Sequence, residues 1–202
     1  MPRQKILQEN QTYTFSSYFD MPYEPDEIIG EFGYTLQRQK LALPETKSEL
    51  TNLGNLRQRL ENILPLVSLT SETARREVLV APILMEVAAY CNCQLRIEYA
   101  LNVNSWLRGS LDYLLLSEED FLVIEAKKDD LTRGFTQLAV QLIALAEVEA
   151  KEHFYGAVTI GNAWSFGKLE TEGKVIYQDI ALYSVPKDLE LLMGILVEIL
   201  GK

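Results

Sequence analysis

Residues 107–128 constrain this chain more than any other segment, because two apolar runs there are joined by a short acidic turn. The segment LRGSLDYLLLSEEDFLVIEAKK is typical of a β-hairpin. With the turn at 117–120, the register of an antiparallel pair places Asp112 opposite Glu125. Opposed side chains lie about 5 Å apart, and two carboxylates at that distance destabilise a sheet unless a cation lies between them. The hairpin therefore predicts a cation site.

Three charged side chains converge on this hairpin. Side chains alternate along a strand, so Glu125 and Lys127 project from one face, and Asp112 reaches that face from the neighbouring strand. An ion pair with Lys127 explains one carboxylate and leaves the other uncompensated. Mg²⁺, with Mn²⁺ as a substitute, takes oxygen ligands of the kind that Asp112, Glu125 and the backbone carbonyl of Ala126 offer. A lysine beside such a metal can orient or activate a water, which predicts phosphodiester hydrolysis.

The hydrophobic pattern on both sides of the hairpin predicts an ordered series of helices and strands. Before it we expect a helix that Ser71 caps and Pro82 kinks, and then a strand at 94–103. After it we expect a long helix at 131–152. Further elements are expected as helices at 26–31, 47–64 and 188–202 and as strands at 34–43, 155–160, 164–169 and 175–183.

This order predicts an α/β (α+β) fold with an αβββαβ core, a central mixed sheet, a helical N-terminal extension and a C-terminal helix. We expect residues 1–65 to be the extension, packed on a core formed by residues 66–202, with one structural domain overall. Zinc is not expected, because two cysteines and one histidine do not give the spacing of a four-ligand site.

The hairpin motif resembles the signature of the PD-(D/E)xK nuclease superfamily: Asp112, twelve intervening residues and then Glu125-Ala126-Lys127. Members of that superfamily have a restriction endonuclease-like αβββαβ core, with the acid on the second strand and ExK on the third. The resemblance implies a metal-dependent nuclease, with DNA endonuclease activity favoured. Asp112 and Glu125 would bind Mg²⁺, and Lys127 would position or activate water.

The helix at 71–90 resembles the amino-terminal domains of type I restriction subunits, in which a Glu is followed by an Arg and, ten positions after the Glu, by a Pro. Glu72, Arg76 and Pro82 have this spacing. The resemblance implies Glu72 as a further catalytic carboxylate, although interaction with the helix dipole explains a first-turn Glu equally well. Glu77 is the alternative, because it shares a helix face with apolar residues and should point inward.

The helix after ExK carries two glutamines within an apolar run. In many members of the superfamily a Gln here lies close to the lysine, which implies that Gln137 supports Lys127. Some members continue with a Tyr four residues later. This chain has Gln141 there, so it departs from that subgroup and Gln141 is the weaker candidate.

The net charge of −10 is the main evidence against a nuclease. Unspecific affinity for nucleic acid comes from Lys and Arg that displace counterions. Five basic residues fall near the proposed site in sequence order and could form a local phosphate-binding rim, although a solvated charged face explains them equally well: Arg75, Arg76, Arg108, Lys128 and Arg133. The alternative function is a non-catalytic interaction or structural protein on the same fold.

The sequence also suggests where the chain resides and what else it contacts. The first residues lack the apolar run of a signal peptide, and no stretch reaches the roughly 18 uncharged residues of a membrane span. We therefore expect a cytoplasmic protein that binds nucleic acid and no membrane. The segment at 188–202 is apolar around most of its circumference, so it should be either deeply buried or shared with a second copy in a homodimer.

Overall fold

The computed structural model describes residues 5–118 and 120–201. Among these residues a single mixed sheet has eight strands, in the order β1-β7-β6-β5-β4-β3-β2 with β8 paired to β6. The β1–β7 and β4–β5 pairs are parallel and the others are antiparallel. The strands are β1 Thr35–Gln39, β2 Gln94–Asn102, β3 Arg108–Leu116, β4 Phe121–Ala126, β5 His153–Thr159, β6 Ala163–Glu170, β7 Val175–Asp179 and β8 Tyr183–Ser184.

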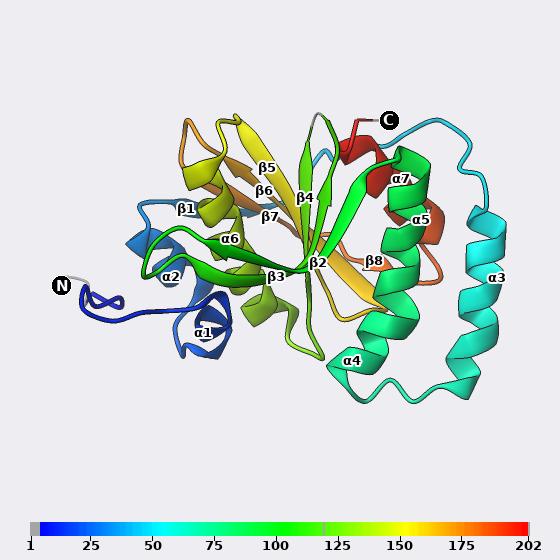
Figure 1. The fold of residues 1–202 in the computed structure, drawn as a ribbon, viewed down its shortest axis with the longest axis horizontal. Helices are drawn as coiled ribbons and strands as arrows, with labels where there is room; N and C mark the ends of the chain where they lie inside the picture. The colour runs from blue at the N-terminus through cyan, green and yellow to red at the C-terminus, as the bar shows by residue number, and fades with distance from the viewer. Residues whose placement is uncertain (1–4, 119, 202) are drawn as a thin grey trace.

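Helices cover both faces of this sheet (Figure 1), and each face has its own hydrophobic cluster. One cluster packs under α6, α1 and α2, and the other under α5 and α7. The helices are α1 Phe15–Asp20, α2 Pro25–Glu31, α3 Leu53–Ile63, α4 Glu72–Arg75, α5 Ala81–Cys91, α6 Leu131–Val148 and α7 Leu189–Ile199, with a 3₁₀ turn at Leu64–Leu66 and a π-helical turn at Arg76–Val80.

The predicted α/β (α+β) class and element order are confirmed. The α4–α5 helix is followed by β2, β3, β4, α6 and β5, which is the expected helix, three strands, helix and strand. The hairpin turn is also confirmed, because the Ser117 amide donates to the Asp120 carbonyl at 3.0 Å and Leu116 pairs with Phe121. Ser71 caps α4 as predicted, since its hydroxyl accepts from the Ala74 amide at 3.1 Å.

Several boundaries differ from the prediction. The helix expected at 47–64 begins at Leu53, because Asn52 has a left-handed backbone with φ of 69°. The strand expected at 175–183 is divided into β7 and β8. Helix α1 was not predicted. Strand β1 belongs to the same sheet as the core, because it pairs in parallel with β7.

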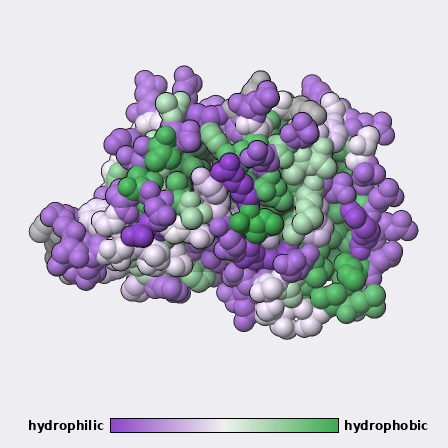
Figure 2. All heavy atoms as spheres, in the orientation of Figure 1, coloured by the Kyte–Doolittle hydropathy of each residue, from purple (hydrophilic) through white to green (hydrophobic). Residues whose placement is uncertain are grey.

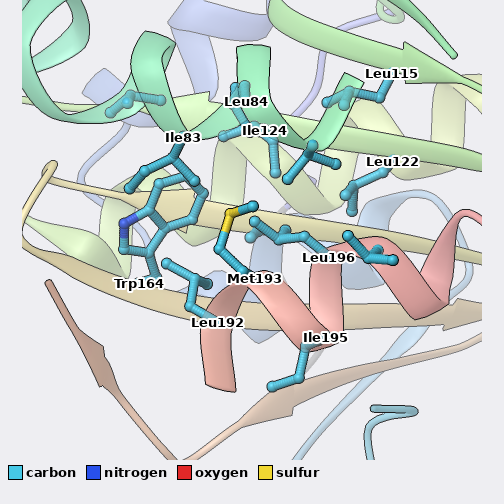
Figure 3. Packing of buried hydrophobic residues seen from close by; sticks show 14 of the residues in the cluster. Ile83, Leu84, Leu115, Leu122, Ile124, Trp164, Leu192, Met193, Ile195 and Leu196 are labelled. Atoms are coloured by element: carbon cyan, nitrogen blue, oxygen red, sulfur yellow. The ribbon is translucent and has the colours of Figure 1, made fainter. Parts of the chain in front are cut away.

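The C-terminal helix was predicted to be either deeply buried or shared with a second copy, and the structure shows α7 deeply buried within the chain. Figure 3 shows Leu192, Met193 and Leu196 of α7 packed with Ile124 of β4 and Trp164 of β6. Among the described residues of α7, Leu191 is the one large hydrophobic side chain that is exposed. The apolar circumference of α7 is largely covered by other described residues of the chain, and a homodimer through this helix stays a prediction.

Helix α3 lies beside α5 at the edge of the molecule (Figure 1). A groove of about 520 Å³ separates it from the α4–α5 helix, with apolar lining from Leu56, Val78 and Pro82. In Figure 2 one of the hydrophobic areas of this face lies at the lower right, and Leu66 after α3 is 79% exposed. No helix in the described ranges has the length and apolarity that a membrane span requires.

Candidate functional site

The β3–β4 ladder opens at the position where the sequence predicts opposed carboxylates. The last ladder pair is Tyr113 with Ile124, so Asp112 and Glu125 do not form the predicted pair within the ladder. Instead, Oδ2 of Asp112 accepts a hydrogen bond from the amide of Ala126 at 2.8 Å. The predicted ladder was one residue pair too long, because the Asp112 carboxylate, rather than a backbone carbonyl of β3, accepts from the Ala126 amide.

The carbonyl of Ala126 also faces the gap between β3 and β4. In an extended strand, the N–H and C=O of one residue point to the same side. The Ala126 amide points to Asp112, whereas the next amide, that of Lys127, donates to the Thr159 carbonyl on β5 at 2.8 Å. The Ala126 carbonyl therefore faces the side on which Asp112 lies, as a shared metal ligand requires.

Glu125 is completely buried and is held by three cationic or amide donors. Its Oε1 lies 2.7 Å from Nζ of Lys127 and accepts from Nε2 of Gln137 at 2.7 Å. Its Oε2 accepts from Nε2 of Gln141 at 2.5 Å. The two glutamines are four residues apart on α6, so they project from one face of the helix toward the same carboxylate.

The sequence reasoning placed Gln137 at the site and gave less weight to Gln141. The structure brings both side chains to Glu125, and Gln137 donates to the same oxygen, Oε1, that Lys127 contacts. Each amide donates to the carboxylate, while its own carbonyl oxygen Oε1 is buried without a donor among the residues that the structure describes. A buried polar atom without a partner costs about 1–3 kcal/mol, which is typical of a site that a water or another group completes.

Burial and neighbouring charges shift the pKa values of both members of the Glu125–Lys127 pair. Burial and the nearby Asp112 carboxylate raise the pKa of Glu125 to about 8, although Lys127 and Gln141 act to lower it. Burial acts to lower the pKa of Lys127, but its attraction to and hydrogen bond with Glu125 raise it overall, with smaller contributions from Asp112 and Glu72. Both shifts favour protonation of the Glu125–Lys127 pair, and a divalent cation bound at Glu125 would compete with that proton.

Of the two candidate carboxylates on the helix, Glu72 lies near the site and Glu77 lies away from it. Glu72 at the start of α4 is half-buried, and its charge raises the pKa of Lys127. Glu77 is exposed and lines the groove toward α3, so the expectation that it points inward is wrong. The reason is the π-helical turn, in which the Ala81 amide bonds to the Arg76 carbonyl and the helix face shifts.

Of the five basic residues expected at a rim, Arg76 is the one that contacts a predicted site residue. Its Nη1 lies 3.7 Å from Oδ1 of Asp112. Arg75 donates to the Ile160 carbonyl at 2.9 Å, and Arg133 pairs with Asp130 at the start of α6. The remaining two, Arg108 and Lys128, are exposed.

Two residues beside the site were not predicted. The Phe19 ring on α1 lies 5.0 Å from Nζ of Lys127, so the N-terminal extension covers the lysine. Glu98 on β2 pairs with Arg76 at 2.7 Å. Glu98 lies between the ladder pairs Ile97–Tyr113 and Tyr99–Leu111, at the level of Asp112 but not paired with it, and nothing in the sequence around Phe19 indicates the position of that ring.

The donor set fits a hard divalent cation. It offers the carboxylate of Asp112, the carbonyl of Ala126 and a buried carboxylate, Glu125, whose pKa is raised by burial and by Asp112. Within 5–118 and 120–201, no group of three or more His, Cys, Asp or Glu side chains is arranged to hold a metal. Two carboxylates and a backbone carbonyl do not require such a group.

Comparisons with known proteins give no relative: no protein-family model, no curated protein and no solved structure matches this chain.

Proposed function

We propose that the chain is a metal-dependent nuclease of the PD-(D/E)xK type, which hydrolyses phosphodiester bonds in nucleic acid, with DNA as the favoured substrate. The observation that carries this proposal is the buried Glu125–Lys127 pair with Asp112 beside it, where the β3–β4 ladder opens. A fully buried carboxylate next to a second carboxylate is unfavourable for stability. Such an arrangement is expected where function requires it.

The chain's own residues have distinct roles in this proposal. Asp112, Glu125 and the Ala126 carbonyl would hold Mg²⁺ or Mn²⁺, which when bound stabilises charge on a phosphate and lowers the pKa of water. Lys127 lies against Glu125 and would orient the attacking water. Gln137 and Gln141 fix the Glu125 carboxylate from α6. Glu72 contributes negative charge near Lys127 and, with the larger effect of Glu125, favours the protonated ammonium.

The test is cleavage of plasmid DNA, single-stranded DNA and RNA with Mg²⁺, Mn²⁺ or EDTA. Glu125→Gln, Asp112→Asn and Lys127→Met should each lower the rate about a hundredfold or more. The matched control is Glu170→Gln, because Glu170 pairs with Lys168 two residues away on β6 at 2.9 Å but lies outside the site. Cleavage that survives in Glu125→Gln, or that EDTA does not stop, contradicts the proposal.

The second candidate is a non-catalytic interaction or structural protein on the same fold. The net charge of −10 favours it, because it opposes the approach of phosphates. In that case no divalent cation binds at Asp112, and Glu125→Gln stabilises the fold without the loss of any activity. Absence of both cleavage and metal binding would support this candidate over the nuclease.

A further inference from the structure

Arg76 holds an unusual position between the helical layer and the sheet. It starts the π-helical turn, a form that is rare outside functional sites, and its guanidinium lies over the Tyr113 ring with 5.1 Å between Cζ and the ring centroid. Its Nε donates to the Tyr113 hydroxyl at 3.4 Å. The side chain is 18% exposed, so it is fixed in orientation but open to solvent on one side.

One guanidinium is shared between two carboxylates. Nη1 of Arg76 lies 2.7 Å from Oε1 of Glu98 and 3.7 Å from Oδ1 of Asp112. Glu98 is therefore its principal partner, and Asp112 is close enough for a substantial attraction. A divalent cation that binds Asp112 would therefore have to compete with Arg76 for this carboxylate.

The donors of Arg76 are only partly used. Nη1 and Nε have protein partners, whereas Nη2 has no acceptor among the residues described in 5–118 and 120–201. A guanidinium with an unused donor edge beside a candidate metal ligand is suited to a phosphate oxygen. Lys could not reproduce this geometry, because its ammonium is a single point of charge.

We infer that Arg76 is a phosphate-binding residue of this site that competes with the metal for Asp112 until the metal binds, and that Glu98 sets the strength of the competition. This inference rests on the proposed function. With Asp112 on the metal, Arg76 stays on Glu98 and Tyr113 and presents Nη2 to the nucleic-acid phosphate. Glu98 has a left-handed backbone with φ of 53° and interrupts the β2–β3 pairing beside Asp112.

The first measurement is Mn²⁺ binding by isothermal titration calorimetry without nucleic acid. Arg76→Met should bind Mn²⁺ about fivefold more tightly than the wild type, because a competing cation is removed from Asp112. Glu98→Gln should bind Mn²⁺ several-fold more weakly, because Arg76 then turns wholly to Asp112. Arg59→Met is the control, since exposed Arg59 of α3 pairs with Glu86 of α5 and neither is a residue of the proposed site. A merely structural role of Arg76 gives weaker binding in both site variants.

The second measurement is the affinity for a fluorescein-labelled DNA duplex and a single strand in Ca²⁺, followed by anisotropy, which needs no cleavage. Arg76→Met should bind nucleic acid about tenfold more weakly. Arg76→Lys keeps the charge, so its Mn²⁺ affinity should match the wild type while its affinity for nucleic acid still falls. Melting temperatures and far-UV circular dichroism identify any variant that fails to fold.

The outcomes separate this inference from the proposed function. If the wild type cleaves nucleic acid and Arg76→Met binds Mn²⁺ and DNA as the wild type does, the role of Arg76 is overturned and the nuclease stands. If the wild type binds neither Mn²⁺ nor nucleic acid, both fail. If the two variants shift Mn²⁺ affinity in opposite directions and Arg76→Met loses DNA affinity, the inference is supported, whatever the natural substrate.

Discussion

Replacement of Glu125 by Gln should change the way in which stability depends on pH. Burial and Asp112 raise the pKa of Glu125 from its ordinary 4.5 to about 8. Because one pKa unit corresponds to about 1.4 kcal/mol, this difference corresponds to at most roughly 5 kcal/mol. A carboxyl group whose pKa is raised by folding contributes stability that is fully present below pH 4.5 and lost as the pH rises through about 8.

The assay is urea unfolding at several pH values between 5 and 9 with EDTA present. The free energy of unfolding of the wild type should fall across this range by about 2–5 kcal/mol more than that of Glu125→Gln, whose amide stays neutral. At pH 9 the variant should be the more stable protein, as expected when a buried functional charge is removed. Mg²⁺ should restore wild-type stability at pH 9 and have no comparable effect on the variant.

Glu170→Gln is the control for this experiment. Its side chain is 41% exposed and its hydrogen bond with Lys168 lowers its pKa, so the variant should follow the wild-type curve within about 0.5 kcal/mol. If the wild type and Glu125→Gln lose stability in parallel between pH 5 and 9, folding does not raise the pKa of Glu125, and the electrostatic argument for the cation site fails.

Three further changes test the packing and the donors around the site. Gln141→Leu should lower the free energy of unfolding by about 1–3 kcal/mol at pH 9 and by clearly less at pH 5, where Glu125 is protonated; equal losses in urea titrations contradict its role. Met193→Ala should cost about 2–4 kcal/mol in the same titrations, whereas exposed Leu191→Ala should cost far less, and similar losses contradict the burial of α7. Gly156→Ala should cost about 1–3 kcal/mol and lower the melting temperature, because its Cβ would lie 2.7 Å from a leucine methyl of α6; an unchanged melting temperature contradicts this close packing.

Most of the element order was predictable because hydrophobic periodicity and capping act locally. The 107–128 hairpin, the Ser71 cap and the strand after α6 follow from residues close together in sequence. The end of the β3–β4 ladder was not predictable in this way. The ladder ends at Ile124 because the Asp112 side chain takes the Ala126 amide, a contact that only the folded geometry of the two strands reveals.

The candidate site was predictable in part for the same reason. Asp112, Glu125 and Lys127 share a face through strand alternation, and the structure brings all three together. The contact between Arg76 and Glu98 depends on a π-helical turn and a left-handed residue, neither of which has a clear local signature. The outward position of Glu77 has the same origin, because periodicity of 3.6 residues does not describe a wide turn.

The most direct test of the central claim is a crystal of the protein grown with Mn²⁺, with data that give an anomalous difference map. The account predicts a peak between the carboxylates of Asp112 and Glu125, within coordination distance of the Ala126 carbonyl, with Nζ of Lys127 beside it. A map with no peak at this position, with Lys127 still paired to Glu125 at a saturating Mn²⁺ concentration, would contradict it.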